Sequence, residues 1–111
     1  MFNNKNVHLI GIGGISMSSI ALMLKNMNAN VTGTDIYETD LTHSLESKGI
    51  IIKYGHHPEM INDADIVIYT AAISENDPER KEAQKMQKEC YERAEFLGIL
   101  MKEFKNALCV S

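Results

Sequence analysis

Several protein classes are excluded by what the sequence lacks. Only two of the 111 residues are cysteines, Cys90 and Cys109, and they are far apart with no CxxC spacing. A disulfide-rich secreted scaffold is therefore excluded, and reduced thiols in a cytoplasmic protein are expected. Lysine and arginine form no continuous stripe and the net charge is −4, which disfavours nucleic acid as a partner.

Long hydrophobic runs and catalytic signatures are also missing. The most apolar segment, from Val7 to Leu24, is interrupted by His8, serines and glycines, so it predicts a strand, a turn and a buried helix and no membrane partner. The polar first residues argue against a signal peptide. No GxSxG motif and no GxxxxGK[ST] loop occurs, so neither serine catalysis nor ATP hydrolysis is expected from this chain.

The composition is that of one ordinary globular domain, with 44% hydrophobic and 23% charged residues. Within it, short apolar runs alternate with segments of helical periodicity. The runs predict strands at residues 7–10, 31–34, 50–54, 65–70 and 90–91, with a further strand beginning at 106–111. This alternation indicates a Rossmann-like, doubly wound α/β sheet, mainly parallel, with five to six strands in a single domain.

The helices are predicted from spacing and from capping residues. Apolar faces are formed by Met17, Ile20, Ala21, Leu24 and Met27, and later by Leu97, Leu100, Met101 and Phe104. Thr39 or Asp40 can cap a second helix that Gly49 ends, and Asp77-Pro78 opens a third towards Lys88. The charges of this third helix, from Glu79 onwards, indicate a solvated face. The link from Tyr54 to Asp65 is too short for a full helical crossover.

The glycine-rich stretch after the first predicted strand points to a ligand. Gly11, Gly13 and Gly14 allow close backbone approach, and the helix start behind them offers free N–H groups and a partial positive charge to a diphosphate. Asp35 ends the second strand, where an acidic residue commonly binds a ribose hydroxyl. Because Ser16 stands at the third position of the motif, the signal is imperfect, and the glycines could instead serve only a tight turn.

Ligands of doubly wound sheets bind at the carboxyl ends of the strands, which nominates four loops. The predicted binding residues are Gly11, Ile12, Gly13, Gly14, Ile15, Ser18, Thr34, Asp35, Gly55, His56, Thr70, Ala71, Ala72 and Ile73. Of the adjacent histidines, His56 is expected to face the cleft, whereas His57 could equally be a surface turn residue. No catalytic residue and no metal ligand set is predicted.

The stretch VHLIGIGGISMS at 7–18 resembles the opening of the UDP-N-acetylmuramate–L-alanine ligases, cytoplasmic enzymes of peptidoglycan synthesis in the Mur ligase family, whose pattern is close to HFIGIGGIGMSGIA. Further matches cover essentially the whole chain and include Gly33-Thr-Asp35, Gly55-His56, Thr70-Ala-Ala-Ile73, Asn76-Asp-Pro78-Glu and Arg93-Ala-Glu95. The sequence departs from the family pattern at three positions. Ser16 and Ser19 stand where the family has glycine, which could alter helix packing or the diphosphate-binding site, and Glu92 stands where the family has a basic residue.

The resemblance implies a role for the whole chain. Residues 1–111 would be the first of three domains, which binds UDP-N-acetylmuramate, and the family's GTHGKT loop of the ATP domain would follow Ser111. In the complete enzyme ATP, with Mg²⁺, phosphorylates the muramate carboxylate, and the amine of L-alanine attacks the acyl phosphate. The chain alone would bind no cofactor and be inactive. An NAD(P)-binding domain of an oxidoreductase or regulatory sensor, and a plain interaction module, are the alternatives.

Overall fold

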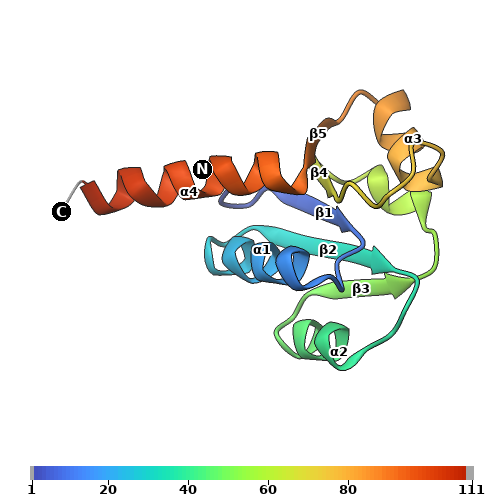
Figure 1. Cartoon of the computed structure of the whole chain (residues 1–111), viewed down its shortest axis with the longest axis horizontal. Coiled ribbons are helices and arrows are strands. Elements are labelled where there is room, and N and C mark those ends of the chain that lie inside the picture. The colour runs from blue at the N-terminus through green and yellow to red at the C-terminus, as the bar shows by residue number, and fades with distance from the viewer. Residues whose placement is uncertain (1, 110–111) are drawn as a thin grey trace.

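A five-stranded parallel sheet forms the centre of the computed structural model, which describes residues 2–109 and gives only the helical backbone for 103–109. The strands, in the order β3-β2-β1-β4-β5, are β1 (Asn6–Ile10), β2 (Asn30–Asp35), β3 (Ile51–Tyr54), β4 (Ile66–Tyr69) and β5 (Glu89–Glu92). The helices are α1 (Ile15–Asn26), α2 (Asp40–Ser47), the 3₁₀ helix η1 (Pro58–Ile61), α3 (Pro78–Lys85) and α4 (Arg93–Cys109). The predicted doubly wound α/β fold is confirmed (Figure 1).

The strand order places a switch point between β1 and β4. From β1 the chain moves outward through β2 to β3, then returns to the other side of β1 and continues through β4 to β5. Every pairing is parallel, so all five carboxyl ends lie at one edge. The loops leaving β1 and β4 diverge there, which opens the crevice in which this kind of fold binds ligands.

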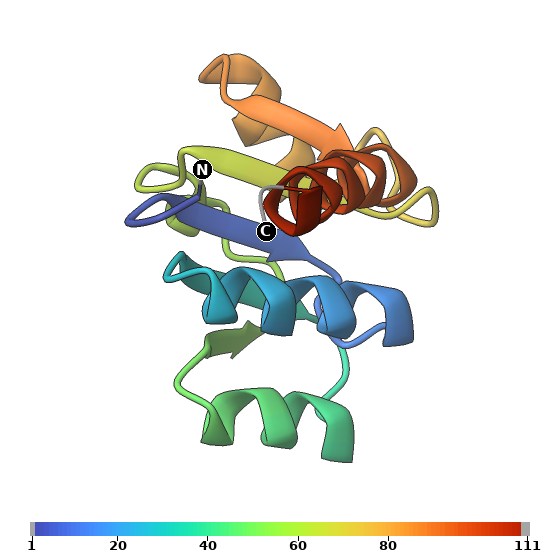
Figure 2. The ribbon, with the colours of Figure 1, turned by 90° about the vertical axis from the view of Figure 1, so that its left-hand side faces the viewer.

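Helices cover both faces of the sheet. The helices α1, α2 and α4 lie on one face, while η1 and α3 lie on the other, as the contacts between α1 and its two neighbours and between α3 and η1 require (Figure 2). The crossover from β3 to β4 contains only η1, which confirms that this connection is abbreviated. The first face therefore has more helical cover than the second.

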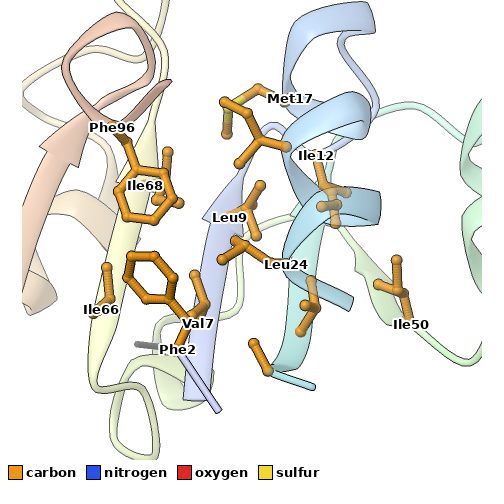
Figure 3. Packing of buried hydrophobic residues seen from close by; sticks show 14 of the residues in the cluster. Phe2, Val7, Leu9, Ile12, Met17, Leu24, Ile50, Ile66, Ile68 and Phe96 are labelled. Carbon is orange, nitrogen blue, oxygen red and sulfur yellow. The ribbon is translucent and has the colours of Figure 1, made fainter. Parts of the chain in front are cut away.

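The first face holds the main hydrophobic core. Side chains from α1 and α4 meet those of the central strands, and Phe96 and Leu9 are fully buried there (Figure 3). The Phe96 ring lies 5.4 Å from the ring of Phe2 and 5.6 Å from that of Tyr91, measured between centroids. Each such buried side chain contributes roughly 1.5–3 kcal/mol, so this cluster is the main source of stability.

Capping residues fix the ends of the shorter helices. Thr39, one of two predicted candidates, caps α2 in a reciprocal arrangement with Thr42, and Gly49 follows α2 at φ +93°. The Asp77 carboxylate accepts the first N–H groups of α3, with Pro78 in the first turn. α3 ends at Lys85, short of the predicted Lys88, because Gln87 adopts a left-handed conformation with φ 56°.

The C-terminal segment differs from the prediction. The strand predicted at 106–111 is wrong for 106–109, where α4 continues, and 110–111 lie outside the described residues. A helix satisfies its backbone hydrogen bonds locally, whereas a strand needs a neighbouring strand. A run of only four apolar residues is therefore weak evidence that the preceding helix ends and a strand begins. On α4, Phe96 and Leu100 are buried but Met101 is 59% exposed; the side chain of Phe104 lies outside the described part.

Candidate functional site

The carboxyl edge of the sheet holds a small cavity of about 100 Å³. Its walls come from the loops after β1, β2, β3 and β4 and from the start of α3. Six predicted residues line it, namely Gly11, Thr34, Asp35, Gly55, His56 and Ile73. The other five were not predicted as binding residues; they are Ile10, Ile36, Tyr37, Asp77 and Glu79.

The glycine loop is held tightly against β2. The N–H groups of Gly11 and Ile12 both donate to the carbonyl of Thr34, at 2.8 and 3.0 Å. Gly11 has φ +81°, a conformation that glycine adopts without strain. The Ile12 side chain is fully buried, and a Cβ on Gly33 would lie only 2.4 Å from it. Ile12 therefore anchors the loop through the core, and its side chain does not face the cavity.

Asp35 closes the loop from the other side. One carboxylate oxygen accepts the N–H of Gly13 at 2.8 Å, and the other accepts the N–H of Tyr37 at 3.0 Å. The N–H of Gly14 donates to the carbonyl of Gly11 at 3.3 Å. The N–H groups of Gly13 and Gly14 are thus engaged within the protein.

The first turn of α1 does offer free donors. Within the described chain, the N–H groups of residues 15–17 have no partner, as is usual for a helix start. Ile15 is 83% exposed and Ser16 is also exposed, so the Ser16 side chain does not enter the helix–strand interface. The buried Ser18 hydroxyl donates to the carbonyl of Ile15 at 2.8 Å, which occupies its proton within α1.

The two histidines after β3 have different surroundings. His56 lines the cavity, and its Nδ1 lies 3.4 Å from a carboxylate oxygen of Asp77. The ring of His57 contacts the carbonyl of Tyr54 at 2.8 Å and the carboxylate of Glu59 at 3.1 Å. The hydrogen bond to the Tyr54 carbonyl raises the pKa of His57.

The loop after β4 reaches the cavity through one residue only. Ile73 lies in its wall, and its carbonyl accepts a hydrogen bond from the Arg80 guanidinium at 3.0 Å. Thr70, Ala71 and Ala72 do not line the cavity, and both alanines are exposed. Arg80 also lies over the Tyr69 ring, 4.2 Å from its centroid, and so fastens both ends of this segment.

Glu79 corrects the expectation of a solvated helix face, because it is only 1% exposed. One of its carboxylate oxygens accepts a hydrogen bond from His8 Nε2 at 2.6 Å. The Thr34 hydroxyl lies 2.7 and 2.8 Å from the two oxygens, and the N–H of His57 donates to one of them at 3.3 Å. Burial raises the pKa of Glu79, but the hydrogen bonds from His8 and Thr34 outweigh it, so the pKa lies below its ordinary value.

His8 is the other buried member of this network. It is fully buried, and its Nδ1 lies 2.9 Å from the Thr32 hydroxyl. Since the Glu79 carboxylate must accept, Nε2 carries the proton, and in the neutral ring Nδ1 accepts from Thr32. A histidine within an apolar strand needs such partners, and this was the one available signal for the network.

His56, Asp77 and Glu79 each place one possible metal-ligand atom within 4.8 Å of the others. No such group was predicted from the sequence, because His56 follows β3 whereas Asp77 and Glu79 lie at the start of α3. Both carboxylates have protein partners: Asp77 accepts the first N–H groups of α3, and Glu79 accepts from His8, Thr34 and His57. These partners account for the cluster without an ion. Among residues 2–109, no helix has the length and apolar character needed to cross a membrane.

Comparison with known proteins gives consistent matches. A family model described as "Mur ligase family, catalytic domain" matches residues 6–105. The chain is 52% identical over 102 residues to a UDP-N-acetylmuramate–L-alanine ligase of Caldicellulosiruptor bescii, covering 92% of this chain and 22% of that protein. The corresponding values for the ligase of Clostridium novyi are 46% over 109 residues, 98% and 24%.

A solved structure agrees with these matches. The UDP-N-acetylmuramate–alanine ligase of Thermotoga maritima superposes with a TM-score of 0.85 at 33% identity, covering 88% of this chain and 23% of that one. The chain thus spans less than a quarter of the length of each of these three relatives.

Proposed function

Because the chain belongs to the Mur ligase family, we propose that it binds the UDP part of UDP-N-acetylmuramate as the first domain of a UDP-N-acetylmuramate–L-alanine ligase. One observation carries the proposal: Gly11 and Asp35 line one cavity at the carboxyl edge of the sheet, and the free start of α1 directly follows the glycine loop. That is where a doubly wound sheet binds nucleotides.

The diphosphate is assigned to the start of α1. The free N–H groups of residues 15–17 and the partial positive charge of the helix end suit a double anion. The N–H of Gly13 is shared with Asp35, so a phosphate oxygen reaching it would have to displace a carboxylate. We therefore place the diphosphate at residues 15–17, whose N–H groups are free.

Asp35 and the turn after β3 are assigned to the nucleoside. Each carboxylate oxygen of Asp35 accepts one backbone N–H and keeps a second lone pair, which can accept a ribose hydroxyl. Tyr37 and Ile36 beside it are 71% and 64% exposed, so they present apolar surface at the mouth of the cavity. Gly55 and His56 would complete the uridine side.

The ligation itself is assigned to a longer protein. We propose that ATP-dependent joining of L-alanine, with Mg²⁺, requires the three-quarters of the relatives that this chain does not cover. The proposed contribution of this chain is substrate recognition. The 111-residue chain alone should bind the nucleotide weakly and catalyse nothing.

Nuclear magnetic resonance titration with UDP-N-acetylmuramate tests this assignment. Amide shifts are expected at residues 14–17, 35–37 and 55–57. The Asp35→Asn variant should bind about tenfold more weakly, since one hydrogen bond to a charged group is worth about 1.5–3 kcal/mol. The matched control is Asp63→Asn, which makes the same change in the exposed loop before β4, at the opposite end of the strands.

A parallel titration with NADH separates the two nucleotide hypotheses. Shifts with NADH at lower concentration than with the UDP-sugar would favour a dinucleotide-binding domain. If millimolar UDP-N-acetylmuramate left the amides of residues 11–18 unmoved in the folded chain, the proposed function would be rejected.

A further inference from the structure

The Glu79 carboxylate connects segments that are far apart in the sequence. It lies at the start of α3 and accepts hydrogen bonds from β1 through His8, from the end of β2 through Thr34 and from the turn after β3 through the His57 backbone. His8 extends the network to Thr32, which precedes Thr34 by two residues in β2. The network thus ties α3 to three of the four segments that form the cavity.

Two of the partners of Glu79 are adjacent to residues that face the cavity. Thr34 directly precedes Asp35, and His57 directly follows His56. Asp77, two residues before Glu79, lies 3.4 Å from His56. A shift of the Glu79 carboxylate would therefore move both sides of the cavity relative to each other.

Packing alone does not require these side chains. The neighbouring cluster on this face, which includes Ile10, Val67 and Ala83, is apolar, and apolar residues could fill the same space. Burying a carboxylate costs several kcal/mol unless hydrogen bonds compensate for it. What the polar side chains add is direction, because a hydrogen bond fixes both distance and angle.

We infer that Glu79, held by His8, is a positioning residue of the cavity, which fixes the turn carrying His56 against the end of β2 that carries Asp35. The residue acts through its neighbours and is not assigned a contact with the nucleotide. The inference rests on the proposed function only where nucleotide affinity is measured.

The test is the Glu79→Gln variant of the 111-residue chain. Glutamine keeps the volume but replaces one acceptor oxygen with a donor, so it cannot accept from His8, Thr34 and His57 together. In the ligand-free variant, hydrogen exchange of the His57 amide should accelerate at least tenfold, while exchange of the Ile52 amide in β3 changes less. Affinity for UDP-N-acetylmuramate should fall at least tenfold.

Two controls separate positioning from general stability. Glu46→Gln makes the same chemical change at an exposed carboxylate that accepts from the Tyr54 hydroxyl at 2.9 Å, and it should alter neither measurement. Val31→Ala removes buried volume at the amino end of β2. Once corrected for the folded fraction, its affinity should equal that of the parent chain, and an equal loss there would make Glu79 merely structural and overturn the inference.

The remaining outcomes are also decisive. A folded Glu79→Gln chain whose His57 exchange and affinity stay within twofold of the parent overturns the inference. If circular dichroism shows that the Glu79→Gln chain does not fold, the Thr34→Val variant is tested in its place. Thr34→Val removes one hydrogen-bond donor to Glu79 and leaves the His8–Glu79 pair intact. Unchanged hydrogen exchange of the His57 amide in that variant would overturn the inference. If the parent chain binds no UDP-sugar, the proposed function fails, and the exchange data alone decide on Glu79.

Discussion

The two faces of the sheet use buried polar groups differently. On the face covered by α1, α2 and α4, buried Ser18 bonds to a carbonyl of its own helix. Buried Thr42 bonds to the cap of its own helix and also accepts a hydrogen bond from the half-buried Tyr54 hydroxyl of β3. On the face covered by η1 and α3, the buried polar groups bond between elements, from α3 to β1 and β2. The first face is joined mainly by apolar contacts, with the Tyr54 hydroxyl as a link to α2, whereas a buried network of directed hydrogen bonds joins α3 to the second face.

This difference separates stability from geometry. Apolar burial is not directional, so the large cluster around Leu9 and Phe96 can stabilise the sheet without dictating where each loop ends. The cavity needs loops from four strands in fixed positions, and the hydrogen bonds of Glu79 lie beneath them. Variants that damage one face should therefore affect different measurements from variants that damage the other.

The largest effect is expected from the apolar face. Phe96→Ala should lower the free energy of unfolding by about 4 kcal/mol, because it removes a fully buried ring and leaves a cavity. Urea unfolding measures the change. Met101→Ala on the same helix, at a side chain that is 59% exposed, should stay within about 0.5 kcal/mol of the parent. Nucleotide affinity of the folded Phe96→Ala chain should be unchanged, and a specific loss would contradict the division between the faces.

The next largest effect comes from breaking the polar pair on the second face. Glu79→Met should cost about 3 kcal/mol, since it leaves buried donors without an acceptor. Adding His8→Leu should restore stability to within about 1 kcal/mol of the parent, because an apolar pair of similar volume can replace a buried polar pair. Affinity for the UDP-sugar should remain low in the double variant. A double variant that recovered both quantities would show that shape alone matters at this face.

A third comparison concerns two glycines. A Cβ on Gly33 would lie 2.4 Å from the Cδ1 atom and 2.7 Å from the Cβ atom of Ile12, so Gly33→Ala should cost about 2 kcal/mol through overpacking and displace the glycine loop. Gly98→Ala meets nothing within 4 Å on an exposed part of α4 and should stabilise the chain by about 0.5–1 kcal/mol. Thermal unfolding of both variants checks the opposite signs; two changes of the same sign would contradict the close packing of Ile12.

Much of the fold could be predicted from local patterns. Continuous apolar runs located the five strands because both faces of a parallel sheet are covered, and the Asp77-Pro78 pair located the start of α3. The strand predicted at 106–111 is wrong for 106–109, because a short apolar run suits a helix equally well and only the presence of a neighbouring strand could distinguish the two. Tertiary context, which a short segment does not encode, decided that case.

The candidate site was less predictable. The rule for doubly wound sheets located its loops, but the bond from Gly13 to Asp35 depends on a distance across two strands. Glu79 stands among alternating charges that indicate a solvated face, yet it is buried because α3 presents its first turn to the sheet. Which acidic residue of a charged helix is buried depends on a hydrogen-bond donor in the sheet beneath the helix. Here that donor is His8, which lies 71 positions away in the sequence.

The smallest expected effect concerns pH. Burial raises the pKa of Glu79, but the bonds from His8 and Thr34 outweigh it and hold the pKa below the ordinary value of 4.5. A carboxyl group whose folded-state pKa is depressed contributes stability above its unfolded pKa and loses it as the pH falls through the folded pKa. The difference in unfolding free energy between the parent and Glu79→Gln should thus be complete above about pH 5 and shrink on acidification below about pH 4.5. Urea unfolding at a series of pH values measures it, with Glu46→Gln as the exposed control. A difference that grew towards acid pH would mean that Glu79 is buried as the neutral acid, and the polar face would then lack the charged acceptor on which its geometry depends.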